Sequence, residues 1–532
     1  MYIFKALISQ NQCHIETNMK QYKPALGGVY YYTEKLNAED DMVKTAIKNK
    51  GVGIRETSEY IEIYNDPYCS VPLYILKTQN GVCITSIYEK IETENMKVDL
   101  IGFYETLLYE SALYDRTLYE EVKQLPAASY VKINKHKLDY NIENYWNFDI
   151  SENRSINSEE QAIDLVWNKL CSIFSQYNEK KLIMGISGGL DSRLSLCVMN
   201  SVLDMKKIEA FTFGHSKGIL DYKLACETCA KLEAPIIPRF YKLSGNAYLE
   251  SMELPLKTSG GVGINHSHIY WCLSQMDTQG KTLVSNYYSD AVMGYDCLPI
   301  EYEDVVENCA YYKKLHSNKF HLDEEMVRKI EKDIRKITDR RTRNSNFSCY
   351  DEFIYLVERN PKFHIKLSYA FSERVPVVLP YAEYGLLETV ISLPLKYRYR
   401  KQIEHLILQD KMGKLRDISS TRYAGVDKEE KKFESKCYYN FGFLLMRITN
   451  LCNSGLNIIS RGTIQIPNPY ITENQLAIFN RYFAKYQKNA CNELYKNGLI
   501  SKELFNKLKG RPKRTAEAQL CFGIIGLWSV IK

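Results

Sequence analysis

The chain has 532 residues, of which 45% are hydrophobic and 25% charged, and its formal net charge is +6. A chain of this length is too long to fold around a single hydrophobic core, which predicts at least two domains. The composition excludes a disordered chain. The mild charge gives no indication of nucleic-acid binding, and no run approaches the roughly 18 apolar residues of a membrane span. The first residues do not resemble an export signal, so we expect a cytoplasmic protein whose fifteen cysteines are reduced.

Residues 1–150 predict a β-rich domain. Short segments of aromatic and β-branched residues alternate with Asn, Gly and Pro, which is typical of antiparallel strands. We expect strands over 2–8, 28–32, 60–64, 71–75, 82–87 and 130–133. The composition then turns polar over 151–157, and this change places a domain boundary near residue 150.

Residues 151–532 predict a second, α/β domain. Ser158 and Gln161 form a capping box at the start of a helix with apolar residues at helical spacing. Strands and helices then alternate: strand 182–186, helix 191–202, strand 208–213, helix 221–232 and strand 282–285. This alternation favours a parallel sheet that binds its ligand at the carboxyl ends of the strands. The remainder is mostly helical, and 520–531 predicts a buried terminal helix.

The sequence SGGLDS follows the strand over 182–186 and opens the next helix. Gly188 and Gly189 allow the backbone to approach an anion closely, and the helix start offers unpaired amides. Ser187 and Ser192 add hydroxyl groups. Asp191 makes chemical sense beside a polyphosphate only when a divalent cation lies between them. We therefore expect an ATP site that uses Mg²⁺.

Asp290 is the candidate for a second Mg²⁺ ligand. It lies in the segment 283–291, where a strand ends and a loop begins. On the same sheet as Asp191 it would bring a second carboxylate to the metal that bridges the ATP phosphates. The alternative is an exposed loop aspartate.

SGGLDS resembles the pyrophosphate loop of ATP pyrophosphatases, and several longer stretches resemble the asparagine synthetase family. NDPY followed by PLY over 65–74 resembles the family's RDP…PLYY segment, TFG over 212–214 its adenine-side strand, 285–294 its SGEGADExxxG segment, and 374–376 the start of RVPFLD. The resemblance implies an Ntn-hydrolase-like glutaminase domain over 1–150 and an ATP-pyrophosphatase-like synthetase domain with a helical extension over 151–532. It also implies that Phe213 lies by the adenine and that Lys401 steadies the pyrophosphate.

The first departure from that family concerns the glutaminase nucleophile. Members that hydrolyse glutamine have a cysteine directly after the initiator methionine, where its thiol and free amine form nucleophile and base. This chain has Tyr2 there, and a phenol titrates near pH 10. Cys13 is neither terminal nor in the matching place. We expect a degenerate glutaminase domain without glutamine hydrolysis.

The second departure lies in the acceptor pocket, where Tyr287 replaces the glutamate of asparagine synthetase. In β-lactam synthetase a tyrosine at this place works with a glutamate to deprotonate an internal amine. Glu358 lies upstream of Arg374 in the region where that acid is expected. The resemblance thus implies a Tyr287–Glu358 dyad; the alternatives are core packing for Tyr287 and a solvated helix face for Glu358.

These observations predict a ligase that adenylates a carboxylate with ATP, releases pyrophosphate and passes the acyl group to an amine. Both departures favour a tailoring enzyme similar to lasso-peptide cyclases or β-lactam synthetases, acting on a small-molecule or peptide carboxylate with a precursor peptide or leader-binding protein as partner. The alternatives are an ammonia-using asparagine synthetase and a silent nucleotide-binding scaffold. We expect no nucleic-acid or membrane partner.

Three further motifs are weaker. NHSH over 265–268 is a candidate metal pair, although histidines two residues apart do not share a helix face. The basic segment 328–343 is typical of a solvated helix face, with docking of an acidic peptide as the alternative. The CxxC of Cys226 and Cys229 is better explained by helix packing than by redox or zinc chemistry.

Overall fold

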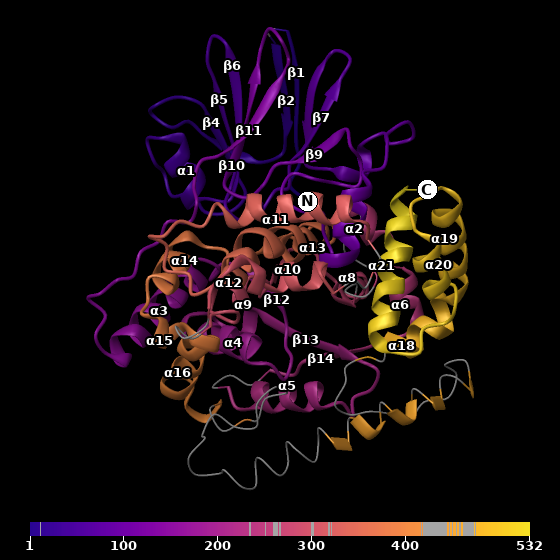
Figure 1. Cartoon of the computed structure of the whole chain (residues 1–532). Coiled ribbons are helices and arrows are strands. Elements are labelled where there is room, and N and C mark those ends of the chain that lie inside the picture. Colours follow the sequence, from indigo (N-terminus) through magenta and orange to yellow (C-terminus); the bar gives the residue numbers. More distant parts are fainter. Residues whose placement is uncertain are drawn as a thin grey trace.

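The computed structural model is mixed α/β, with antiparallel sheets in the N-terminal region and a parallel sheet after them (Figure 1). It describes the chain except residues 11, 233–235, 251, 259–263, 265–267, 299–302, 318–319, 321, 416–417, 419–443, 446, 450, 454, 457–458, 461–465, 467–472, 474 and 532. Among the helices described, none has both the length and the apolar character needed to cross a bilayer.

Two antiparallel sheets form the N-terminal region. The first has the order β2 (Gln12–Thr17), β1 (Phe4–Ser9), β8 (Gly81–Thr85), β7 (Tyr74–Thr78) and β9 (Val122–Gln124). The second has the order β11 (Tyr140–Asn144), β10 (Ser129–Asn134), β6 (Tyr60–Asn65), β5 (Gly51–Glu56), β4 (Val29–Tyr32) and β3 (Lys20–Tyr22). In both sheets, neighbouring strands, such as β1 and β2 or β10 and β11, pair in opposite directions.

The two sheets bury a common core. Phe4 and Ile84 of the first sheet and Ile61, Ile63 and Val131 of the second are fully buried in one cluster. Apolar residues alternate along these strands, so one face of each sheet turns inward. Helix α1 (Met42–Lys48) packs on the second sheet through Met42 and Ala46. Helix α2 (Leu100–Tyr109) is buried along almost its whole length and joins the larger core of the second region.

The second region is built on a five-stranded parallel sheet. Helix α3 (Glu159–Ser175) leads into it, and the predicted capping box of Ser158 and Gln161 is present. The sheet order is β14 (Arg239–Lys242), β13 (Ile208–Gly214), β12 (Lys181–Gly185), β15 (Lys281–Val284) and β16 (Val377–Val378). The chain leaves β12 toward β13 and later returns to pair β15 on the other side. Such a reversal of strand order opens a crevice at the carboxyl ends of the strands.

Helices pack around this sheet, as Figure 1 shows. The first are α4 (Leu190–Val202), α5 (Leu220–Ala230), α6 (Gly245–Leu249), α7 (Leu254–Lys257), α8 (His268–Ser274), α9 (Ser289–Val292), α10 (Ala310–Leu315) and α11 (Glu324–Thr338). Then come α12 (Tyr350–Ile354), two π-helical turns (Tyr355–Arg359 and Pro361–Ile365), α13 (Lys366–Phe371), α14 (Tyr384–Ile391), α15 (Leu395–Arg398) and α16 (Gln402–Lys411). A separate group of C-terminal helices contains α18 (Gln475–Ile478), α19 (Ala484–Lys496), α20 (Lys502–Leu508) and α21 (Thr515–Ile531).

The elements predicted from the sequence are present, with one shifted strand. The segment expected as a strand over 71–75 pairs only from Tyr74 onward. Pro72 has no amide hydrogen to donate to a neighbouring strand, so Val71 and Leu73 serve as buried core residues instead. The last antiparallel strand ends at Asn144 and α3 begins at Glu159, on either side of the predicted boundary at 150. The predicted terminal helix is α21.

Candidate active site

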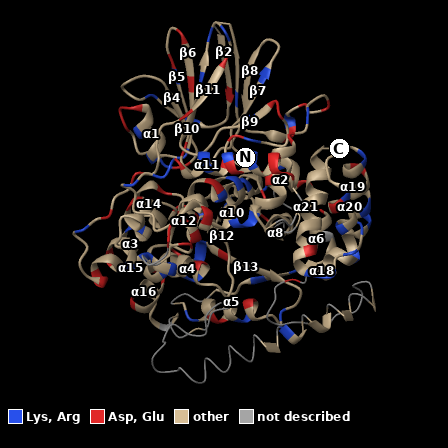
Figure 2. Cartoon of the chain, in the orientation of Figure 1, with Lys and Arg blue, Asp and Glu red and all other residues tan. Residues whose placement is uncertain are grey.

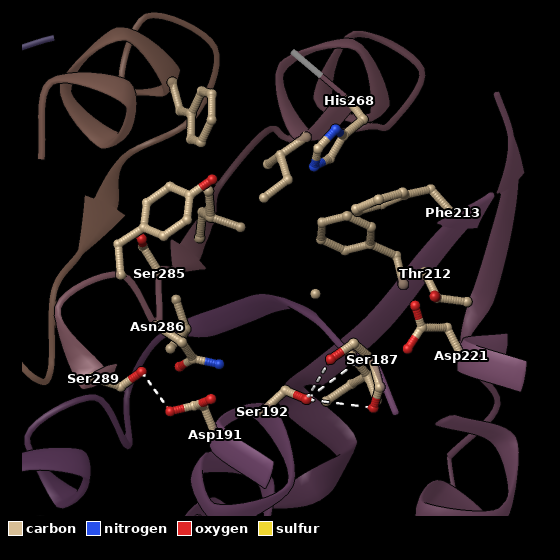
Figure 3. A pocket seen from close by; sticks show the side chains of 18 of the residues that line it. Ser187, Asp191, Ser192, Thr212, Phe213, Asp221, His268, Ser285, Asn286 and Ser289 are labelled. Carbon is tan, nitrogen blue, oxygen red and sulfur yellow. Dashed lines mark hydrogen bonds between the residues drawn. The ribbon is translucent and has the colours of Figure 1, made fainter. Parts of the chain in front are cut away.

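A cavity of about 430 Å³ lies at the carboxyl ends of β12, β13 and β15, within the size range of small-ligand sites. Its lining brings together six of the sequence-predicted site residues: Ser187, Asp191, Ser192, Phe213, Tyr287 and Asp290. Figure 3 shows Ser187, Ser192 and Asp191 on one wall and the rings of Phe213 and His268 on another. The cavity therefore has a polar end and an apolar end.

The SGGLDS loop supplies the polar wall through its hydroxyl groups. The Ser187 amide lies 3.2 Å from Ser192 Oγ, and the Ser187 and Ser192 hydroxyls are also 3.2 Å apart. The two glycine amides are paired inside the protein: Gly188 donates to Asp221 Oδ1 at 2.8 Å and Gly189 donates to Ser187 Oγ at 3.1 Å. An anion would thus meet the serine hydroxyls first, and the glycine amides only after Asp221 and Ser187 move.

Lys401 draws both predicted metal carboxylates to one point. Its Nζ makes a short ion pair with Asp191 Oδ1 and lies 2.7 Å from Asp290 Oδ1 and 3.0 Å from Glu404 Oε2. Ser289 adds a hydrogen bond to Asp191 Oδ1 at 2.8 Å (Figure 3). The two carboxylates are therefore close enough to share one cation.

Burial and charge act against each other in this cluster. Burial alone would raise the pKa of Asp191, but the Lys401 ammonium and the Ser289 hydroxyl outweigh it and the pKa is lowered. Burial works against the ammonium of Lys401, yet Glu404, Asp191 and Asp290 raise its pKa well above the usual value. Glu404 is fully buried, and burial together with Asp191 raises its pKa to about 8. The cluster keeps Asp191 and Lys401 charged.

Unusual backbone geometry places Lys401. Arg400 and Lys401 both have left-handed conformations, with φ of 44° and 62°, which residues with long side chains rarely adopt. The Lys401 amide donates to the Gly294 carbonyl at 3.1 Å. Gly294 itself has φ of 84°, and a Cβ there would lie 2.4 Å from the Arg398 carbonyl oxygen. Residues in such sparsely populated regions cluster at functional sites because the surrounding structure holds them there.

Aromatic groups form the other end of the cavity. The rings of Phe213 and His268 lie 4.4 Å apart at 37°, on β13 and α8 respectively. Phe211, Thr212 and Ile269 line the same region. Phe213, which the family resemblance places by the adenine, therefore lies in a part of the cavity with aromatic and apolar walls.

The expected pairing of Tyr287 with Glu358 is wrong in this structure. Tyr287 lines the cavity and stacks on His364, with ring centroids 4.9 Å apart at 16°. Glu358 is fully buried but points to the domain interface, where its Oε1 lies 2.7 Å from Lys362 Nζ and accepts from the Tyr114 amide at 2.9 Å. Glu358 lies within the first of two π-helical turns, and the Lys362 ammonium and the Tyr114 amide occupy its Oε1.

Tyr287 itself is a neutral phenol. Burial raises its pKa far above the usual value. A buried phenol whose pKa is raised by burial keeps its proton at neutral pH, so Tyr287 can donate or accept a hydrogen bond but does not act as a phenolate base.

Three N-terminal groups bear on the predicted loss of glutaminase activity: the Met1 amine, the Tyr2 hydroxyl and the Cys13 thiol. The Met1 amine donates to the Ser372 carbonyl at 2.7 Å, and the Tyr2 hydroxyl donates to the Thr33 carbonyl at 2.6 Å. Cys13 lies on β2, and burial raises the pKa of its thiol to about 11. A thiol with this pKa is almost entirely protonated at pH 7 and is a poor nucleophile.

Sequence reasoning missed three polar groups of the site. Ser289 lies in the segment 283–291 but has no pattern of its own, Glu404 has no signal beyond its place three residues after Lys401, and Glu473 comes from the distant C-terminal region. Glu473 lines the cavity, accepts a hydrogen bond from the side-chain Nε2 of Gln475 at 3.0 Å, and has a pKa that burial raises to about 7. A helix-face argument from Lys401 could have found Glu404.

Of the weaker motifs, only NHSH contributes a described residue to the cavity lining. Of NHSH, residues 265–267 lie outside the described part, and His268 belongs to the aromatic wall. In the basic segment, Lys329, Arg335 and Arg341 pair with Glu325, Glu307 and Asp304, and Figure 2 shows acidic residues interspersed with basic ones around α11. Arg340 is buried and donates to the Ala127 carbonyl at 2.8 Å. The segment is thus a neutralised surface rather than an open basic patch.

In the part of the chain that the structure describes, no group of three or more His, Cys, Asp or Glu side chains is arranged to hold a metal ion. Asp191 and Asp290 alone would need phosphate oxygens or water to complete the octahedral shell of Mg²⁺.

Comparison with known proteins gives no assignment: no protein-family model and no curated protein sequence matches this chain.

Proposed function

We propose that the protein is an ATP-dependent ligase that adenylates a carboxylate, releases pyrophosphate and joins the acyl group to an amine. The observation that carries the proposal is the Lys401 ammonium between Asp191 and Asp290, at the edge of a cavity whose wall is the SGGLDS loop. Two carboxylates that converge on one cation beside paired serine hydroxyls are what a magnesium polyphosphate requires.

The cavity has room and chemistry for a nucleotide. Adenine would lie toward Phe213 and His268, and the phosphates toward Ser187 and Ser192. Asp191 and Asp290 fit Mg²⁺, which when bound neutralises phosphate charge and activates the α-phosphorus toward attack. Lys401 would then turn from the carboxylates to the leaving pyrophosphate, where its charge stabilises the transition state more than the ground state.

The reaction has two balanced steps. A carboxylate oxygen of the substrate attacks the α-phosphorus of ATP, which forms the acyl-adenylate and breaks the bond to pyrophosphate. The amine nitrogen then attacks the acyl carbon, the bond to AMP breaks and the amine loses a proton. Tyr287, a neutral phenol at the cavity wall, would orient the amine by a hydrogen bond. The proton that the amine loses would pass through the phenol to solvent or to AMP.

This chemistry accords with the folds that the family resemblance implies: a degenerate Ntn-hydrolase-like domain followed in the chain by an ATP-pyrophosphatase-like synthetase domain. The contacts of Met1 and Tyr2 and the high pKa of Cys13 support an enzyme that does not take nitrogen from glutamine. We therefore favour an internal or peptide amine, as in peptide or natural-product tailoring with a small-molecule or peptide carboxylate and a precursor peptide. An ammonia-using asparagine synthetase is the second candidate.

Calorimetry with the non-hydrolysable analogue α,β-methylene-ATP tests the nucleotide site. The wild type should bind the analogue in a Mg²⁺-dependent manner, and Asp191→Asn should weaken binding roughly 10- to 100-fold, as loss of a group at a metal site does. Asp164→Asn is the matched control, because Asp164 pairs with Lys411 at 2.8 Å on an open surface. Absence of binding by the wild type, or equal binding by both variants, would remove the nucleotide site.

A further inference from the structure

One side chain of the N-terminal domain reaches the wall of the candidate active site. Tyr68, in the turn after β6, packs its ring edge-on against Tyr288, with ring centroids 5.2 Å apart at 84°. Both rings are about 1% exposed. Tyr288 lies between Tyr287 and Ser289, which both line the cavity. The two domains therefore meet at the centre of the 285–290 segment.

Tyr288 has a conformation that its own sequence does not favour. Its φ of 87° lies in the left-handed region, which is a genuine outlier for a bulky residue. This turn directs Tyr287 and Ser289 into the cavity. Ser289 then donates to Asp191 Oδ1 at 2.8 Å, so the conformation of Tyr288 is connected to the carboxylate cluster. A strained residue of this kind persists only when its surroundings hold it.

The rest of the segment is held by the synthetase domain itself. The Ser285 amide donates to the Val378 carbonyl at 3.0 Å, and Asn286 Oδ1 accepts from the Ser195 hydroxyl at 3.0 Å. The Tyr288 hydroxyl donates to the Leu356 carbonyl at 2.8 Å, which fixes one end of the side chain. The face of the Tyr288 ring is covered by Tyr68. The N-terminal domain thus supplies the support at the one strained position.

Tyr68 is well placed to give that support because its own backbone is rigid. The buried carboxylate of Asp66 accepts from the Tyr68 amide at 2.8 Å and from the Gly51 amide at 2.9 Å, and it also accepts from the Ser70 hydroxyl. These bonds fix the 66–70 turn to β5. The Tyr68 hydroxyl has no hydrogen-bond partner among the described residues, so its ring rather than its polar group makes the contact.

We infer that Tyr68 is a positioning residue through which the N-terminal domain keeps the 287–289 segment in its cavity-facing conformation. The domain would thereby contribute to the synthetase site in place of a glutaminase activity. The inference deepens the proposed function and rests on it for the role of the cavity, but the contact can be tested without a substrate.

Hydrogen exchange of the full-length protein tests the contact. The amides of Ser289, Val292 and Met293 donate to the carbonyls of Asn286, Tyr288 and Ser289, so their exchange reports opening of this turn. Tyr68→Leu should raise their exchange roughly two- to twelvefold, the ratio that corresponds to the usual worth of an aromatic pair. Tyr68→Phe, which keeps the ring, should exchange like the wild type.

The same proteins should differ in binding of α,β-methylene-ATP with Mg²⁺: Tyr68→Leu should bind several-fold more weakly, and Tyr68→Phe should bind normally. Tyr68→Met, a flexible filler of similar length, should behave like Tyr68→Leu and serves if the leucine variant does not fold.

Unchanged exchange of the 289–293 amides in the folded leucine or methionine variant would overturn the inference. So would equal acceleration across β5 and β6, which would indicate general loosening of the domain. If the wild type does not bind the analogue, the proposed function fails while the exchange result still decides this inference.

Discussion

Two corners of the molecule differ in their chemistry. One lies at the carboxyl ends of β12 and β15, and the other is the N-terminal corner around Met1, Tyr2 and Cys13. At the first, Lys401, Asp191 and Asp290 converge within ion-pair distance beside a cavity. At the second, the Met1 amine and the Tyr2 hydroxyl are committed to backbone carbonyls. The difference shows that two parts of one chain can use their polar groups differently, so a function has to be argued from the groups of each site rather than from the fold.

The two corners also differ in how their polar groups are paired. Around Lys401, charges are buried together, and removal of one leaves the others without a partner. Around Tyr2, hydrogen bonds to backbone carbonyls predominate: the Tyr2 hydroxyl donates to the Thr33 carbonyl, and the Tyr369 hydroxyl donates to the Tyr2 carbonyl at 2.6 Å. Mutations should therefore affect activity at the first corner and, at most, stability at the second.

The largest effect is expected from Lys401→Met. Loss of the ammonium should lower the rate of AMP formation roughly 10² to 10³-fold, the range observed when one preorganised charge-stabilising donor is removed. Lys411→Met is the matched control at the other end of α16, because Lys411 pairs with Asp164 at the surface, and it should react normally. A Lys401→Met enzyme with full activity would show that the charged cluster around Lys401 is structural. The two corners would then not differ in function.

Tyr287→Phe should separate the two chemical steps. Pyrophosphate exchange into ATP, which follows adenylation, should persist, while amide formation falls about 10²-fold, at the low end of general acid–base effects because the phenol is neutral. Both rates are measured on one preparation with the substrate carboxylate and amine. Equal loss of both steps would place Tyr287 at the nucleotide instead of the acceptor.

Glu358→Gln should change stability and not chemistry. The substitution breaks the buried pair with Lys362 at the domain interface, and we expect the free energy of unfolding to fall by roughly 3 kcal/mol, the lower end for loss of one partner of a buried pair. Urea denaturation measures the change, and the folded variant should retain its rate of amide formation. If Glu358→Gln instead slowed amide formation as much as Tyr287→Phe and left stability unchanged, the result would support a catalytic pair of Tyr287 and Glu358.

The smallest effect is expected at the N-terminal corner. Purified protein should not convert glutamine to glutamate above the buffer background, and Cys13→Ala should not alter this result. Glutamate release is followed by an assay coupled to glutamate dehydrogenase. Activity that disappears in Cys13→Ala would show that the half-buried thiol is reactive in spite of its raised pKa.

The sequence predicted the fold's main elements and the polar end of the cavity because both depend on local patterns. SGGLDS lies directly after a strand, and a parallel sheet has only one edge where such a loop can meet Asp290. The strands over Gln12–Thr17 and Gly51–Glu56 were missed, since the first is polar and the second is interrupted by glycines.

The acceptor side could not be predicted in the same way. Glu358 contacts Lys362 and the amide of Tyr114, and the contact with Tyr114 joins residues that are far apart in the chain and has no local sequence signal. Glu473 reaches the cavity from a distant part of the chain, whereas Glu404 is three residues after Lys401 and could have been found from that spacing. The pairing of Tyr68 with Tyr288 joins residues that are far apart in the chain and offers no local signal.

The position at which ATP is cleaved tests the central claim most directly. ATP labelled at the α-phosphate is incubated with Mg²⁺, the purified protein and a heated, protein-free cell extract as the source of carboxylates and amines. The account predicts label in AMP with one pyrophosphate per AMP, and loss of this product with Asp191→Asn. Label in ADP, or equal AMP from wild type and Asp191→Asn, would contradict it.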